Sequence, residues 1–223
     1  MDILTPIEAR ILGALIEKQM TTPDYYPLTL NALTSACNQK SNRDPVMHLS
    51  DTEILDNIQS LNAKFLITER QLSGSRVNKY SHRLSDDAIE KYTFSKQELA
   101  ILCILLLRGP QTIGEIRTRT TRLSEFDNLP QVESTLTKLA EREDGPYVIG
   151  LARQAGRREG RFAHLFFEQS HYQQPNQQHD TPNHTNENKA TATMENDRLT
   201  QLEQRVAILE EELAFLKEYI NQQ

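Results

Sequence analysis

Basic side chains gather in one short stretch of this chain of 223 residues. Arg153, Arg157, Arg158 and Arg161 follow one another closely there, against a single acidic residue, Glu159. A guanidinium group is always charged, and its fork of N–H donors matches the oxygens of a phosphate. The pattern therefore favours attachment to a polyanion, and it makes this stretch the first place to expect contact with double-stranded DNA.

Smaller groups of basic residues occur at two other places. Arg76 and Lys79 lie in a stretch with the signals of a first β-hairpin, whereas Arg117, Arg119 and Arg122 lie in and after a short predicted helix. Residues two positions apart on a helix point to different sides. We therefore expect only part of the second group to reach phosphate.

A run of polar side chains between residues 38 and 45 is a further candidate binding surface. The members suited to contact nucleic acid or a protein partner are Asn38, Gln39, Lys40, Asn42 and Arg43. The alternative is a solvated loop in which Asn and Ser side chains satisfy neighbouring backbone groups. Both interpretations stay open on the sequence alone.

No residue pattern typical of an enzyme occurs in the sequence. There is no glycine-rich phosphate loop, no HExxH segment and no nucleophile elbow. His171, His179 and His184 lack a fixed spacing and have no neighbouring cysteine ligands. We therefore expect a protein that is not an enzyme and that holds neither a metal ion nor a cofactor.

The net charge of −6 at pH 7 is unevenly distributed. Residues 168–223 contain 10 acidic and 4 basic side chains and account for all of it, so any basic surface in the preceding residues is local. No apolar run approaches the ~20 residues that cross a bilayer, and the N-terminus lacks the pattern of a secretion signal. These features predict a cytoplasmic protein that does not associate with membranes.

The elements that must position these residues form one motif that occurs twice along the chain. Thr5 and Glu8 predict a capping box at the start of an apolar helix, and Ser95 and Glu98 predict another. A short polar helix, a longer amphipathic helix and a two-stranded stretch follow each, with predicted ranges 29–38, 50–64 and 65–84, then 112–120, 129–143 and 147–167. This order predicts an α+β fold with two tandem winged helix-turn-helix domains.

These domains are expected at residues 1–92, here called the first half, and 93–168, called the second half. Cys37 and Cys103 lie in apolar helical stretches of different halves, so we interpret them as core residues without a redox role. His82 and His164 end the two hairpins at equivalent positions. We expect both rings to close a hairpin onto the helices.

The longer amphipathic helices stand where a winged helix would read DNA. In the first half, the residues predicted to form the buried face are Ile54, Leu55, Ile58, Leu61 and Phe65. The residues left on the outer side are Glu53, Asn57, Ser60 and Lys64. In the second half Val132, Leu136 and Leu139 form the buried face. Neither outer face is basic, which argues against DNA as the partner.

The remaining residues predict a linker and a coiled coil. Residues 169–195 contain almost no aliphatic side chains and read as flexible, whereas residues 196–223 read as a helix with a heptad seam. The seam residues are Leu199, Leu202, Val206, Leu209, Leu213, Leu216 and Ile220. In a parallel pair the flanking positions bring together opposite charges, such as Arg198 with Glu203. The pattern predicts a parallel homodimer.

Four stretches resemble those of the bacterial YceH family. They are LTPIEAR at residues 4–10, ACNQKSNRDPVM at 36–47, LLRGPQT at 106–112 and RFAHL at 161–165. The similarity covers both halves, and a heptad tail is similar to that of some members. The resemblance implies a tandem winged-helix fold. It implies no activity, and it assigns no functional residues.

Two classes of function fit these observations. The favoured one is a non-enzymatic DNA-associated protein, for example a transcriptional regulator. The second hairpin and the polar loop support it. The alternative is a module for protein interaction or assembly, with an unidentified protein partner and a dimerising coiled coil. The carboxylates on the amphipathic helices favour this alternative.

The heptad seam leads to a testable prediction. Replacing Leu209 and Leu213 by aspartate puts charges into the dimer interface, so we expect a monomer whose other domains remain folded. Sedimentation equilibrium at tens of micromolar measures this directly. A parent chain that is monomeric, or a double variant that stays dimeric, would show that the seam does not hold two copies together.

Overall fold

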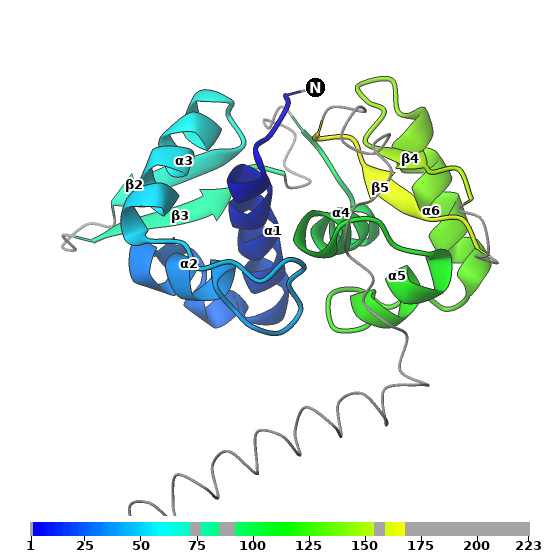
Figure 1. Cartoon of the computed structure of the whole chain (residues 1–223), viewed down its shortest axis with the longest axis horizontal. Coiled ribbons are helices and arrows are strands. Elements are labelled where there is room, and N and C mark those ends of the chain that lie inside the picture. The colour runs from blue at the N-terminus through cyan, green and yellow to red at the C-terminus, as the bar shows by residue number, and fades with distance from the viewer. Residues whose placement is uncertain (1, 72–76, 85–91, 154–158, 168–223) are drawn as a thin grey trace, which may run out of the picture. The chain divides into compact units, whose positions relative to one another are not determined.

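Two sets of three helices, each followed by a pair of antiparallel strands, form the described part of the chain (Figure 1). The computed structural model describes residues 2–71, 77–84, 92–153 and 159–167, all within one compact unit, Met1–Gln174. The predicted linker, the heptad seam, Arg76, Arg157 and Arg158 lie outside the described residues. Among the described helices, none has both the length and the apolar character needed to span a bilayer.

The first half follows the order helix, strand, helix, helix, strand, strand. Its elements are α1 (Pro6–Thr21), a 3-10 helix (Pro23–Tyr25), β1 (Leu28–Thr29), α2 (Leu30–Cys37), α3 (Asp51–Ala63), β2 (Ile67–Gln71) and β3 (Asn78–His82). The strands form an antiparallel sheet in the order β1-β3-β2. Ile67 lies opposite His82, and Leu28 lies opposite Tyr80.

The second half repeats this order with a shorter sheet. Its elements are α4 (Lys96–Arg108), α5 (Ile113–Thr120), α6 (Leu129–Glu141), β4 (Val148–Gly150) and β5 (Phe162–His164). The two strands are antiparallel, with Val148 opposite His164. Gln111 makes an isolated bridge to Phe162, and this bridge stands where β1 stands in the first half. The predicted α+β class is confirmed in these residues.

Capping boxes start four of the described helices. The two that the sequence predicted, at Thr5 and Ser95, have the reciprocal bonds to Glu8 and Glu98. Two further boxes begin α3 at Ser50 and α5 at Thr112. In each, the hydroxyl accepts one backbone N–H and the glutamate accepts another, so local chemistry fixes where the helix begins.

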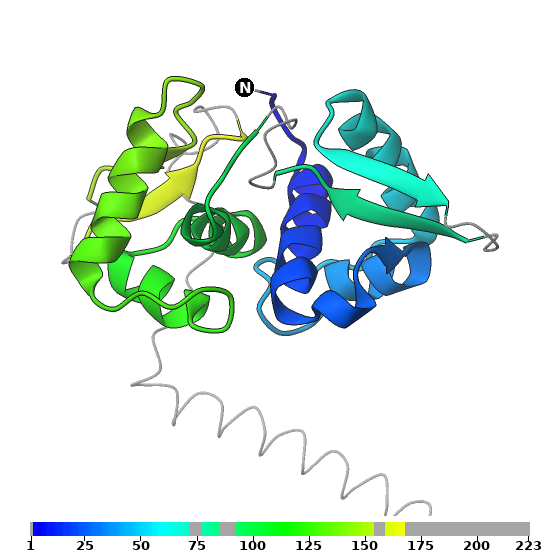
Figure 2. The same cartoon turned by 180° about the vertical axis from the view of Figure 1, so that it is seen from behind.

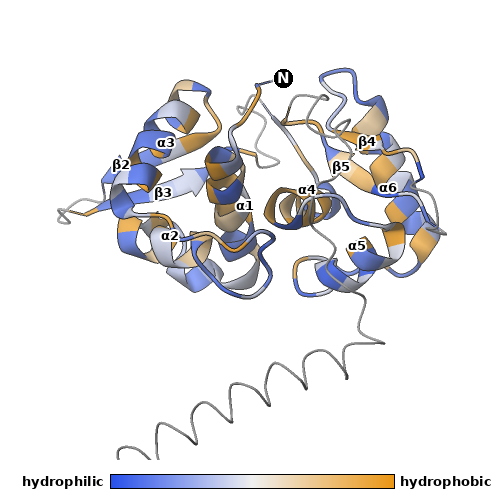
Figure 3. Ribbon diagram, viewed as in Figure 1, coloured by the Kyte–Doolittle hydropathy of each residue, from blue (hydrophilic) through white to orange (hydrophobic). Residues whose placement is uncertain are grey.

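Helices α1 and α4 lie side by side at the centre of this unit (Figures 1 and 2). Residues 8–16 of α1 and 98–107 of α4 are buried on every face, and apart from Glu8, Arg10 and Glu98 they are apolar or small, as expected for central helices. Figure 3 shows α4 largely in the hydrophobic colour. At the crossing, a Cβ atom on Gly13 would lie 2.9 Å from Leu107 Cγ, so the glycine permits the close approach.

Backbone hydrogen bonds also join the halves. The Leu4 amide donates to the Phe166 carbonyl at 2.7 Å, and the Asp44 amide donates to the Leu107 carbonyl at 2.9 Å. Buried residues of both halves belong to one hydrophobic cluster. The predicted boundary between residues 1–92 and 93–168 therefore separates two halves that share one hydrophobic core.

The buried face of α3 is narrower than predicted. Ile54, Ile58 and Leu61 are buried, but Leu55 is 37% exposed and Phe65 is 60% exposed. The expectation that both belong to the core is wrong for two reasons. Leu55 lies on the solvent side of the helix, and Phe65 follows its end with a positive φ of 59°, which takes it out of the helical register.

The predicted core cysteines and hairpin histidines are buried. Both thiols are unbridged, and burial raises the pKa of Cys37 to about 12, so it stays protonated. His82 Nδ1 accepts from the Leu84 amide at 3.1 Å, and its Nε2 meets Gln19 of α1. The ring thus closes the hairpin onto a helix, and burial lowers its pKa to about 4.

The close approach at Gly13 predicts a strong response to side-chain size. Replacing Gly13 by leucine should lower the free energy of unfolding by ~1 to 3 kcal/mol, because the added side chain overpacks the core. Gly114→Ala in α5 is the matched control, since its Cβ would meet nothing within 4 Å. Alanine favours the helix there by up to ~1 kcal/mol. Urea unfolding measures both, and a Gly13→Leu variant as stable as the parent would contradict this packing.

Candidate nucleic-acid interface

The polar loop after α2 is closed by its first residue. The Asn38 side chain donates to the Leu49 carbonyl at 2.8 Å and accepts from the Leu49 amide at 2.7 Å. This pair of bonds replaces the backbone ladder that the loop lacks. Asn38 therefore shapes the loop, as the solvated-loop interpretation expected.

Arg43 is buried instead of facing solvent. Its guanidinium donates to both carboxylate oxygens of Glu17 in α1, at 3.1 and 2.6 Å. It also donates to the Ala36 carbonyl at 3.1 Å and to the Gln39 side chain at 2.8 Å. The prediction that Arg43 contacts an external partner is therefore corrected: these groups occupy its donors, and Gln39 serves to orient it.

A second buried arginine, which the sequence analysis did not single out, holds the same loop. Arg10 of α1 donates to the Cys37 carbonyl at 3.1 Å and to the Pro45 carbonyl at 2.6 Å. Burial, followed by the nearby positive charge of Arg43, lowers its pKa from the usual value. Its position inside an apolar helical run was the available signal, because a cation there needs internal acceptors.

The outer end of the loop reaches the end of α4. Asn42 has a positive φ of 59°, and its side-chain oxygen accepts from the Arg108 guanidinium. Together with the backbone bond from Asp44 to Leu107, this contact ties the first half to the second. Of the predicted loop residues, Lys40 and Asn42 remain exposed.

Arginines of the second half surround one carboxylate. Glu115 caps α5 by accepting from the Thr112 amide at 2.9 Å. Its other oxygen lies 3.5 Å from Arg119 and 3.7 Å from Arg161. Burial lowers the pKa of Arg108, and the positive charge of Arg119 lowers it further. The cluster therefore combines three cations with one shared anion.

The other predicted basic residues differ in their availability. Arg117 donates to the carbonyls of Phe126 at 3.4 Å and Asp127 at 3.0 Å, so it holds the turn before α6. Arg153 is exposed beyond β4, and Lys79 is half-buried on β3. As predicted, Arg117 and Arg119 serve different sides of α5.

Two further cations are paired with carboxylates of the chain itself. Lys64 donates to Glu8 at 2.6 Å, and Arg142 donates to Asp144 at 2.7 Å. Burial raises the pKa of Glu8, but hydrogen bonds from Lys64, Ser60 and Thr5 outweigh it and hold the pKa below its usual value. The charged Glu8 thus stabilises the fold above the unfolded-state pKa, and this contribution is lost as pH falls through the lowered folded-state pKa.

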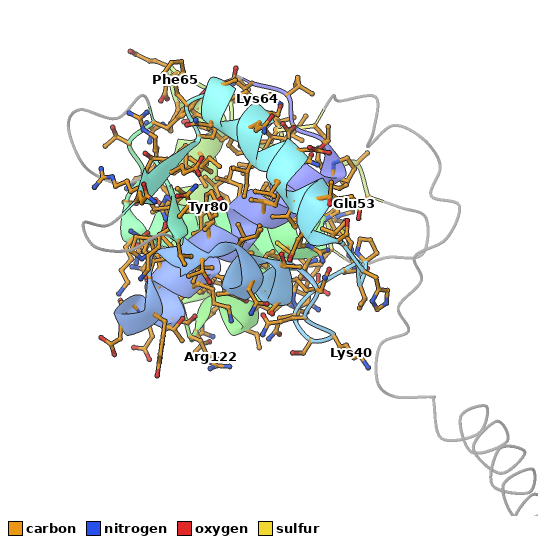
Figure 4. All side chains as sticks on the ribbon, turned by 90° about the vertical axis from the view of Figure 1, so that its left-hand side faces the viewer. Lys40, Glu53, Lys64, Phe65, Tyr80 and Arg122 are labelled. Atoms are coloured by element: carbon orange, nitrogen blue, oxygen red, sulfur yellow. The ribbon has the colours of Figure 1, made fainter. Side chains whose placement is uncertain are left out.

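The outer faces of α3 and α6 are not basic. Asp51, Glu53 and Asp56 are exposed on α3, which contains neither lysine nor arginine. Figure 4 shows Glu53 on this helix. On α6 the exposed charges are Glu133, Lys138 and Glu141. The prediction that neither outer face is basic is therefore confirmed.

Residues 4–157 match the model of a family described as protein of unknown function, DUF480. The chain belongs to the DUF480 family. A UPF0502 protein of Aliivibrio fischeri (strain MJ11) is 50% identical over 227 residues, covering 99% of this chain and 98% of the relative. One from Aliivibrio salmonicida is 48% identical over 222 residues, covering 99% and 98% of the two chains. The membership of a bacterial family without an assigned activity, expected from the YceH resemblance, is confirmed.

The burial of Arg43 in this DUF480 protein predicts a large and specific loss of stability. Arg43→Met removes the nearer cation from the largely buried Glu17, which keeps only Lys18 at 4.0 Å, and should lower the free energy of unfolding by ~3 kcal/mol. Arg117→Met is the control, because it removes hydrogen bonds from an exposed turn and should cost on the order of 1 kcal/mol. Adding Glu17→Leu to Arg43→Met should recover part of the loss.

Urea unfolding of these variants decides the role of the pair. The account is contradicted if Arg43→Met costs no more than Arg117→Met. It is also contradicted if the added Glu17→Leu substitution lowers the stability further.

Proposed function

We propose that this protein is a non-enzymatic DNA-associated protein that contacts phosphate through its second half. We interpret both halves as winged helices, since each has three helices and a terminal hairpin in the order of that motif. The fold alone does not decide the function, because the same architecture also serves protein binding. The argument therefore rests on where the charges lie.

The observation that carries the proposal is the shared carboxylate of Glu115. Arg119 and Arg161 lie 3.5 and 3.7 Å from it, and Arg108 is close enough to Arg119 for its pKa to be lowered. Like charges held together repel each other, so an arriving anion is bound more strongly. A phosphodiester backbone supplies such anions at regular spacing.

The sequence extends this cluster along the second hairpin. Arg153 is exposed at the start of the segment that joins β4 to β5, and Arg161 lies at its end. Arg157 and Arg158 lie between them in the chain. Contacts from these residues would position the protein on a duplex without reading its sequence. A transcriptional regulator is the form of such a protein that tandem winged helices favour by analogy.

The same charges argue against α3 as a reader of the major groove. Its outer face presents Asp51, Glu53 and Asp56, and Lys64 at its end is paired with Glu8. Carboxylates on a protein surface lower its affinity for DNA because the phosphates repel them. We therefore assign the DNA contact to the second half, while homodimerisation through residues 199–220 and a cytoplasmic location stay predictions.

A protein partner is the second candidate, and one observation favours it. Leu55 is exposed on α3, where Asp51 and Asp56 are also exposed, and Phe65 is exposed just after the helix, with the Arg83 guanidinium 5.8 Å from its ring centroid. Exposed apolar side chains with a charged rim are typical of protein interfaces. This surface would suit a basic partner.

Neutralising the second hairpin tests the DNA proposal. The variant Arg157→Ala, Arg158→Ala and Arg161→Ala should weaken binding to random-sequence duplex to a similar extent for all sequences. The slope of log affinity against log salt should fall by ~0.9 for each phosphate contact that is lost. Fluorescence anisotropy titrations at several salt concentrations measure both quantities.

Arg70→Ala with Lys79→Ala in the first hairpin is the comparison variant. A slope that falls only in this variant would move the contact to the first half and contradict the proposal. A parent chain that shows no binding to duplex at low salt would overturn DNA association and leave the protein partner as the better function.

A further inference from the structure

We infer that the phosphate-contacting surface continues across the junction of the halves, so that the first-half loop contributes Lys40 to it. This inference rests on the proposed function and adds where the duplex lies. The surface, here called the junction stripe, consists of Arg161, Arg119, Arg122, Arg108 and Lys40. It does not include the outer faces of α3 and α6.

The first part of the junction stripe follows α5. Arg161 lies at the start of the helix, where it donates to the Pro110 carbonyl at 2.8 Å, and Glu115 lies in the first turn. Arg119 is one further turn along the same face, at i+4 from Glu115. Arg122 follows the end of the helix and is exposed. The helical period thus places these cations in a row.

The second part crosses from α4 to the first half. The positive charge of Arg119 lowers the pKa of Arg108, and the Arg108 guanidinium donates to the Asn42 side chain of the loop. Arg108 therefore lies between Arg119 and the loop. Lys40 is exposed two residues before Asn42. Figure 4 shows Lys40 and Arg122 at the same lower edge of the molecule, whereas Lys64 and Phe65 lie at the opposite edge.

The carboxylates beside the junction stripe do not neutralise it. Those near Arg108 are Asp44 and Glu17, and Glu17 is already paired with Arg43. Glu115 is shared by Arg119 and Arg161 and also caps α5. The five cations of the stripe therefore retain a net positive charge.

The loop is held firmly enough to act as part of a binding surface. Arg10 and Arg43 bind its backbone from inside, and Asp44 donates to Leu107 of the second half. Lys40 therefore keeps its place relative to α5, and less conformational entropy is lost when phosphate is bound. A duplex seated on the junction stripe contacts both halves at once.

Removing two exposed members of the stripe, one from each half, tests the inference. The full chain carrying Lys40→Gln and Arg122→Gln is titrated with a random-sequence 20-bp duplex at several salt concentrations. We expect the slope of log affinity against log salt to fall by ~1.8, which corresponds to two lost phosphate contacts. Both side chains are exposed, so the variant should unfold in urea like the parent.

Lys96→Gln with Lys138→Gln is the matched control, since it removes the same charge from exposed positions outside the stripe. The inference requires that this control keeps the slope of the parent. A parent that binds while Lys40→Gln with Arg122→Gln keeps its slope would overturn the junction stripe and leave DNA association intact. A parent that does not bind duplex would overturn both.

Discussion

The buried guanidinium of Arg43 must be neutralised where it lies, because an unpaired charge in a protein interior costs several kcal/mol. Glu17 of α1 supplies the opposite charge, at 2.6 Å, and the Ala36 carbonyl at the end of α2 supplies a further acceptor. The loop that carries Arg43 therefore folds inward over α1. Its outer end then meets α4, where Asp44 and Asn42 bind Leu107 and Arg108. This ion pair thus acts together with the packing of α1 on α4 to fix how the first half meets the second.

This arrangement changes what the polar loop can do. The side chains that would have formed a binding surface are used to orient each other, and Lys40 is the cation that the loop still presents to solvent. The exposed positive charge gathers along α5 and the end of α4, whereas α3 presents carboxylates and two apolar side chains. The halves are alike in fold but differ in the partners their surfaces suit. We propose a phosphate backbone as the partner of the second half, and a basic protein is the alternative partner for the outer face of α3.

The sequence predicted the elements well because their signals are local. Capping residues such as Thr5 and Ser95 mark helix starts through bonds to residues three positions away, and the hairpins follow from short alternating runs. The burial of Arg43 was not predictable in this way, since its partner Glu17 is distant in the chain. Phe65 fits the apolar spacing but itself adopts a left-handed backbone conformation just after the end of α3. The all-round burial of α1 and α4 did have a signal, which is the continuous apolar run that each contains.

The central claim is that the loop and the α1–α4 contact make the two halves one cooperative unit. Native-state hydrogen exchange tests it most directly, because slowly exchanging amides report the free energy of the opening that exposes them. The account predicts that amides in residues 11–16 of α1 and 101–107 of α4 exchange with the same opening free energy and the same dependence on denaturant. Amides of α4 that open at a distinctly lower free energy, while those of α1 stay protected, would contradict it.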